Sequence, residues 1–104
     1  MNTLEKLDQI IAGRKTADPE SSWTAKLFAK GPEKCAEKFG EEAIEAIIAA
    51  VKNDTADLTA EAADVLFHLL VMLRSRDVSL ADVLAELDRR EGTSGIAEKA
   101  ARKP

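Results

Sequence analysis

Two pairs of acidic residues have the spacing in this chain that most clearly suggests chemistry. Glu45 follows Glu42 by three residues, and Asp64 follows Glu61 by three residues. On a helix, side chains spaced i,i+3 lie on one face. Fifteen residues separate the pairs, enough to finish one helix, turn and begin an antiparallel partner. The pattern therefore predicts four carboxylates that face one another between two helices.

Four carboxylates placed this closely repel one another unless a cation lies among them. Carboxylate oxygens without thiols or paired histidines favour a hard cation such as Mg²⁺. We therefore expect the four acids to form a magnesium site. The alternative is an ordinary solvated stripe that pairs with lysine and arginine. The predicted ligands are Glu42, Glu45, Glu61 and Asp64.

The segment after the second acidic pair is unusually apolar. Eight of the nine residues in 65–73 are apolar, and the exception is His68. A helix that is apolar on nearly all sides is buried. A chain of 104 residues has few other elements to cover such a helix. We therefore expect a homodimer, in which a second copy supplies the cover.

Composition excludes several classes of protein. The net charge of −4 argues against general nucleic-acid binding, which needs a basic face, but allows a phosphorylated substrate bridged by metal. The single Cys35 excludes an intramolecular disulfide and a multi-cysteine zinc site. There is no apolar run of about 18 residues and no hydrophobic N-terminal signal region. We therefore expect a cytoplasmic protein that does not contact membranes.

Hydrophobic periodicity predicts an all-α protein without strands, with residues 1–104 forming one domain. We expect a bundle of about five helices, with a four-helix core completed by dimerisation. Gly13 should end the first helix, and Ser79 with Asp82 resembles a capping box that starts the last. We expect the tail, 91–104, to be mobile. The expected helices cover residues 3–12, 23–30, 32–52, 56–76 and 80–90.

Four lysines recur at intervals of four residues and lead directly to the first acidic pair. They could neutralise phosphate oxygens beside a bound metal ion. Lys38 and Glu42 are also spaced i,i+4, so the alternative is a surface ion pair worth a few tenths of a kcal/mol, about 0.3–0.5. Both interpretations can hold for different members of the set. The lysines are Lys26, Lys30, Lys34 and Lys38.

Two residues that occur once each leave alternatives open. His68 lies one turn after Asp64 and could be an ordinary core histidine, could orient Asp64, or could contact a substrate. Trp23 could stack on a nucleotide base, or could pack the second helix onto the bundle.

Other catalytic classes are poorly supported. Di-iron bundles use Glu-x-x-His pairs, but the residue three before His68 is Val65. Cys35 has no histidine near it in the sequence, and neither a nucleophile elbow nor a phosphate-binding P-loop is present.

The acidic spacing resembles the signature of the all-α nucleoside triphosphate pyrophosphatases. More closely, the chain is similar to the phosphoribosyl-ATP pyrophosphatase family over most of residues 4–90. Trp23 and Phe67 stand where members often carry tyrosine. The matching segments are 22–28, 31–34, 38–45, 61–71 and 78–87.

This resemblance implies the second step of histidine biosynthesis, in which phosphoribosyl-ATP and water give phosphoribosyl-AMP and pyrophosphate. It also implies a dimeric helical bundle, and we expect the stand-alone form of the enzyme. Mg²⁺ on the four acids would neutralise the leaving pyrophosphate. Glu41 or Glu45 would orient or deprotonate the water, and Trp23 or a neighbouring apolar residue would face the adenine. The four lysines would hold phosphate oxygens.

Two alternatives remain at this point. One is a house-cleaning pyrophosphatase that prefers free nucleoside triphosphates and shares the fold and metal site. The other is a non-catalytic helical dimerisation module, in which glutamine could replace the acids without loss of partner binding.

Overall fold

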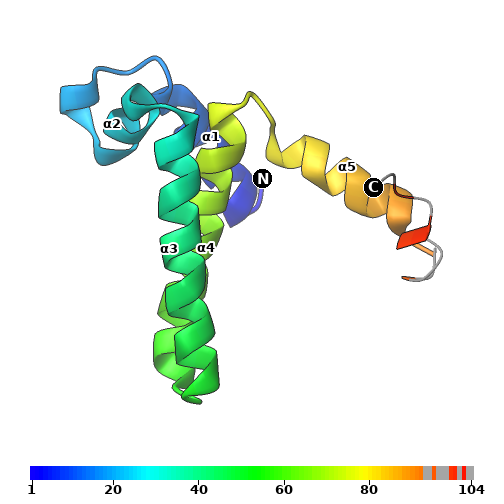
Figure 1. The fold of residues 1–104 in the computed structure, drawn as a ribbon. Coiled ribbons are helices and arrows are strands. Elements are labelled where there is room, and N and C mark those ends of the chain that lie inside the picture. Colours follow the sequence, from blue (N-terminus) through cyan, green and yellow to red (C-terminus); the bar gives the residue numbers. More distant parts are fainter. Residues whose placement is uncertain (93–94, 96–98, 101, 103–104) are drawn as a thin grey trace.

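The computed structural model describes residues 1–92, 95, 99–100 and 102, and within them it is helical with no strand (Figure 1). The all-α expectation is confirmed. The elements are α1 (Thr3–Arg14), the short 3₁₀ helix η1 (Pro19–Ser21), α2 (Trp23–Lys30), α3 (Pro32–Val51), α4 (Thr55–Ser75) and α5 (Leu80–Arg90).

The two longest helices, α3 and α4, form an antiparallel hairpin that dominates the molecule (Figure 1). Pro32 starts α3 directly after Gly31, whose φ of 98° is readily adopted only by glycine. At the far end, Asn53 turns the chain with φ 58°, and the Asp54 side chain caps α4 by accepting from the Asp57 N–H at 3.0 Å. This tight turn brings the second acidic pair back alongside the first.

The hydrophobic core lies at one end of the hairpin, where α1 and α2 pack against α3 and α4 (Figure 1). The other end of the hairpin, which includes the α3–α4 turn, extends beyond these two helices (Figure 1). The site residues are therefore carried by a hairpin that is anchored at one end. The buried core cluster consists of Ile11, Leu27, Cys35, Leu70, Val71 and Leu80.

A buried ion pair joins three elements beside this core. Asp8 of α1 accepts from Arg74 of α4 through both carboxylate oxygens, at 2.9 and 2.7 Å. The same carboxylate accepts from the backbone N–H of Leu80, the first residue of α5, at 3.1 Å. Hydrogen bonding to Arg74 holds the pKa of Asp8 below its ordinary value. The network fixes where α1, α4 and the start of α5 meet.

Beyond that corner, α5 projects away from the other helices (Figure 1). Its start is fixed by the predicted capping box: the Asp82 N–H donates to the Ser79 hydroxyl at 3.1 Å, and the Ser79 N–H donates to the Asp82 carboxylate at 3.0 Å. Leu84 and Leu87 are exposed along the helix. Within the described residues, α5 therefore presents apolar side chains that this chain does not cover.

Two expectations need correction. Gly13 does not end the first helix, because α1 continues through it to Arg14, and one glycine in a helix costs only about 1 kcal/mol. The stretch 13–22, between the first two expected helices, contains the short helix η1. Of the apolar segment 65–73, the structure buries His68, Leu70 and Val71 and leaves Leu66 exposed.

The expected mobile tail includes residues that lie outside the described set. None of the helices that the structure describes is long and apolar enough to cross a membrane.

Candidate metal centre

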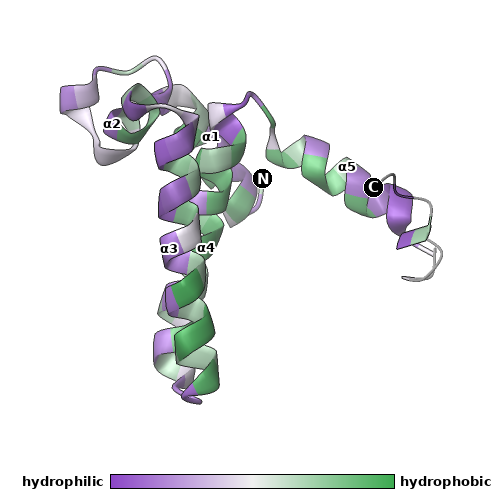
Figure 2. Cartoon of the chain, in the orientation of Figure 1, coloured by the Kyte–Doolittle hydropathy of each residue, from purple (hydrophilic) through white to green (hydrophobic). Residues whose placement is uncertain are grey.

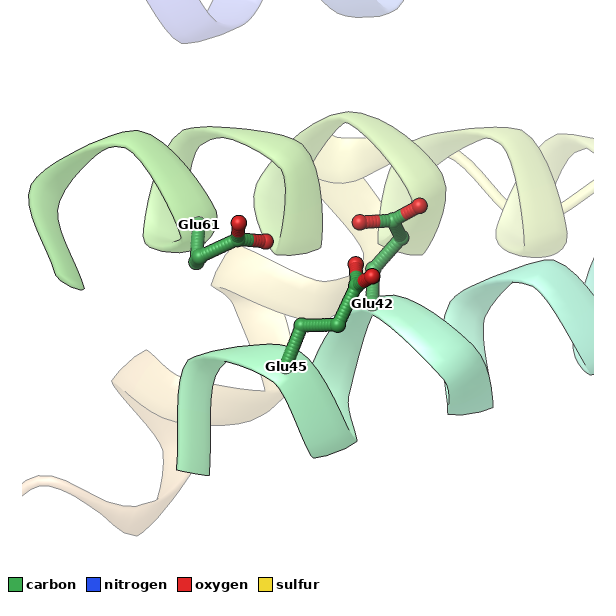
Figure 3. Close-up of side chains that lie close together, drawn as sticks. All are labelled: Glu42, Glu45 and Glu61. Carbon is green, nitrogen blue, oxygen red and sulfur yellow. The ribbon is translucent and has the colours of Figure 1, made fainter. Parts of the chain in front are cut away.

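Three acidic side chains converge between α3 and α4. Glu42 and Glu45 extend from α3, and Glu61 extends from α4 toward them (Figure 3). One carboxylate oxygen from each can lie within 4.8 Å of the other two. The i,i+3 spacing on α3 and the antiparallel return of α4 produce this arrangement. Such a group offers the oxygen ligands that hard divalent cations bind.

Neighbouring acids raise the pKa of Glu42 and of Glu61. Hydrogen bonding with Glu45 raises the pKa of Glu42 above its ordinary value, and burial and the negative charges of Glu45 and Asp64 raise it further. Lys38 acts in the opposite direction. The pKa of Glu61 is raised chiefly by burial and then by neighbouring acids, Glu45 first among them. The ionised group is therefore strained by repulsion, which a bound cation would relieve.

One oxygen of this group also lacks a partner. Oε2 of Glu61 is buried and makes no hydrogen bond to the described residues. A buried carboxylate oxygen without a donor is costly, whereas a coordinated metal ion satisfies it. The donor set, the raised pKa values and this unpaired oxygen together fit a divalent cation.

The fourth predicted ligand, Asp64, is not part of the group of three. It lies one turn beyond Glu61 on α4 and is exposed. Its negative charge nevertheless raises the pKa of both Glu42 and Glu61, so it lies close to them. The structure therefore brings three of the four predicted acids together and leaves Asp64 beside them.

The four predicted lysines differ in their ion pairs and in how close they lie to the acidic group. Nζ of Lys38 lies 3.5 Å from a Glu41 oxygen and 3.8 Å from a Glu42 oxygen, directly beside the acidic group. Lys34 pairs with Glu37 at 3.3 Å. Lys26 and Lys30 are exposed on α2. The Lys38–Glu41 pair was missed by the sequence analysis, although its i,i+3 spacing could have revealed it.

Trp23 is 53% exposed at the start of α2, so its ring is not buried as a packing residue between helices. Ser22 caps this helix by accepting from the Ala25 N–H at 3.0 Å. His68, in contrast, is buried at the border between the core and the acids. Its ring meets Phe67 edge-on, with centroids 5.2 Å apart.

Comparison with known proteins decides the family. A sequence profile described as phosphoribosyl-ATP pyrophosphohydrolase matches residues 4–91, which include every acid and lysine discussed above. The chain belongs to the phosphoribosyl-ATP pyrophosphohydrolase family. The resemblance found from the acidic pairs and their flanking segments is thereby confirmed.

Relatives match over nearly their whole lengths. A phosphoribosyl-ATP pyrophosphatase of Rhodobacter capsulatus is 78% identical over 102 residues, covering 98% of this chain and 99% of the relative. Proteins of the same description from Dinoroseobacter shibae and Ruegeria pomeroyi are 74% and 72% identical. These alignments cover 98% of this chain in both cases, and 100% and 97% of the relatives.

Proposed function

We propose that this chain hydrolyses phosphoribosyl-ATP to phosphoribosyl-AMP and pyrophosphate, the second step of histidine biosynthesis, in the cytoplasm. The observation that carries the proposal is the convergence of three glutamates between α3 and α4, in a chain whose family and full-length relatives are named for this activity. Hydrolysis of a phosphoric anhydride needs negative charge neutralised on the leaving group, and a metal on these acids suits that need.

Glu42, Glu45 and Glu61 would hold Mg²⁺, with Asp64 available beside them. Bound there, Mg²⁺ supplies Lewis-acid stabilisation of charge on the phosphate oxygens. Lys38 lies next to the same acids and would contact a phosphate oxygen, with Lys26, Lys30 and Lys34 as further candidates.

The remaining roles concern the water and the base. Glu45 lies in the acidic group, and Glu41 is joined to it through Lys38, so either carboxylate could take a proton from the attacking water. Trp23 is exposed and could stack on the adenine. No side chain needs to form a covalent intermediate.

A direct assay tests the proposal. The purified chain is incubated with phosphoribosyl-ATP, with and without Mg²⁺, and the products are separated by chromatography. We expect phosphoribosyl-AMP and pyrophosphate only when Mg²⁺ is present. A higher kcat/KM for free nucleoside triphosphates would favour the house-cleaning alternative, and no turnover of either substrate would favour the non-catalytic module.

Lys38→Met should separate a phosphate contact from a surface ion pair. The change keeps most of the apolar stem and removes the charge. We expect kcat/KM for phosphoribosyl-ATP to fall by about 10²-fold, by analogy with other preorganised electrostatic contacts, with a melting shift of a few degrees, about 2–4 °C.

The control is Lys6→Met on α1, an exposed lysine outside the site, which should leave activity unchanged. Normal kcat/KM in the Lys38 variant, with stability alone altered, would reduce Lys38 to a structural partner of Glu41 and Glu42.

We also propose that the functional form is a homodimer. Its support is a ridge of exposed apolar side chains on α3, near the α3–α4 turn, where Figure 2 shows green over the free end of the hairpin. An exposed apolar patch of this kind marks an interaction site. The ridge consists of Ile44, Ile47, Ile48 and Val51, with Leu66 exposed on α4.

Sedimentation at micromolar concentration should give a mass at least twice the 11.3 kDa of the chain. Ile47→Glu should shift the protein toward monomer, because it places a charge in the ridge. Ile10→Glu is the matched control, since Ile10 is similarly exposed but lies on α1. An active wild-type monomer under these conditions would contradict the dimer.

A further inference from the structure

His68 is a buried polar residue that the proposed reaction leaves without a role. It is 7% exposed on α4, and its Nδ1 makes no hydrogen bond to the described residues. Among the described residues, the other buried side-chain atom without a partner is Oε2 of Glu61, in the acidic group and two turns earlier on the same helix. Both unpaired atoms thus belong to one polar stripe of α4, which indicates that a single binding event could satisfy both of them.

The charged groups around His68 come from two helices. Burial and Lys38 of α3 lower its pKa, while Asp64 of α4 and Glu41 of α3 act in the opposite direction. The ring is therefore neutral near pH 7, with one nitrogen a donor and the other an acceptor. The His68 ring also meets the ring of Phe67 edge-on.

Asp64 is the neighbour that lacks a place in the metal group. It is exposed, one helical turn before His68, while the three glutamates have already converged. Side chains spaced i,i+4 are neighbours, and helical side chains lean toward the N-terminus of their helix. His68 therefore leans toward Asp64. The charge of Asp64 acts on the pKa values of His68, Glu42 and Glu61, so Asp64 lies close to both the imidazole and the acidic group.

We propose that His68 is a positioning residue whose Nδ1–H donates to the Asp64 carboxylate when a divalent cation binds, so that Asp64 joins the three glutamates as a fourth ligand. The inference rests on the proposed metal site. It gives the buried Nδ1 of His68 a hydrogen-bond partner. Carboxylate ligands are commonly held in this way by hydrogen bonds from a neighbouring residue.

Calorimetric titration with Mg²⁺ alone, without substrate, tests the proposal. His68→Leu removes the donor and keeps an apolar side chain, with His68→Met as a second apolar variant should the first not fold. We expect Mg²⁺ affinity to fall by about 10- to 100-fold, as for other residues that orient metal ligands, while the melting temperature without metal is kept or raised. His68→Asn should restore most of the affinity, because the Asn amide nitrogen lies close to the position of Nδ1.

A double-mutant cycle shows whether the residue acts through Asp64. Asp64→Asn should weaken Mg²⁺ binding, and adding His68→Leu should weaken it no further. Unchanged affinity in His68→Leu, an equal loss in His68→Asn, or multiplying losses in the double variant would each overturn this role alone. Wild-type protein without any Mg²⁺ binding would instead overturn the metal site, and this inference with it.

Discussion

Glu61→Gln is expected to abolish hydrolysis of phosphoribosyl-ATP while the helical fold survives. Glutamine has nearly the same shape but removes a negative ligand from the group that Glu42 and Glu45 complete. Loss of one electrostatic contact to a reacting phosphate typically costs about 10²–10³-fold in kcat, and a metal site missing a charged ligand should lose at least as much. Steady-state kinetics at saturating Mg²⁺ measures the effect.

The same variant should be more stable than the wild type in the absence of metal. The pKa of Glu61 is raised in the folded state above its ordinary value of 4.5, so the folded state favours the protonated form. Protonation of Glu61 therefore stabilises the folded state. This stabilisation is fully present below pH 4.5 and is lost as pH rises through the folded-state pKa. Glutamine does not ionise, so the variant does not lose this stability as pH rises. The difference in melting temperature between Glu61→Gln and the wild type should therefore be largest near pH 7 and should vanish in acid.

Two further variants complete this test. Asp64→Asn should also lower activity, since its charge acts on the same group. Glu91→Gln, an exposed acid beyond α5, makes the same chemical change away from the site and should leave kinetics unaltered. Near-normal turnover in both the Glu61 and Asp64 variants would remove the metal assignment.

The acidic group could be predicted because its geometry is local. Spacing of three residues on a helix places Glu42 beside Glu45, and a fifteen-residue separation, long enough for a turn, places Glu61 opposite them. The capping box of Ser79 and Asp82 follows from equally local chemistry and was predicted for the same reason. Asp64 shows the limit, because a shared helix face does not decide which carboxylates converge.

Features that depend on distant parts of the chain were not predictable in the same way. Asp8 looks like an ordinary polar position of a short amphipathic helix, yet it pairs with Arg74, 66 residues away. No local feature of the sequence predicts that α5 projects away from the other helices, as Figure 1 shows. The face with Ile47 resembles a core-facing stripe, but the helices that would cover it pack at the other end of the hairpin. These outcomes depend on how helices pack, which periodicity does not specify.

Asp8→Asn is expected to cause the largest loss of stability among the changes considered. The Asp8 side chain is only 7% exposed and accepts from Arg74 twice and from the Leu80 backbone once. Removing one partner of a buried ion pair leaves the other charge uncompensated and typically costs about 3–5 kcal/mol. Because Arg74 is partly accessible, we expect about 3 kcal/mol, measured by urea unfolding.

A double-mutant cycle that combines Asp8→Asn with Arg74→Met tests whether the stability is lost because the ion pair is broken or because packing is lost. The double variant should lose less stability than the sum of the single variants, because neither charge then remains unpaired. Asp77→Asn is the matched control, since it breaks the exposed ion pair with Lys15 and keeps a residue that tolerates the φ of 60° at this position. Its effect should be small. Additive losses at Asp8 and Arg74 would show that the two residues do not act as a pair.

The pH dependence provides an independent check of the same pair. The pKa of Asp8 is held below its ordinary value of 3.8 in the folded state, first by hydrogen bonding to Arg74. The stability that ionised Asp8 contributes is therefore fully present above pH 3.8 and is lost as pH falls through the folded-state pKa. The stability gap between wild type and Asp8→Asn should be constant near neutrality and should narrow as pH falls below 3.8. A gap that stays the same in acid would mean that the charge of Asp8 does not stabilise the corner where α1, α4 and α5 meet.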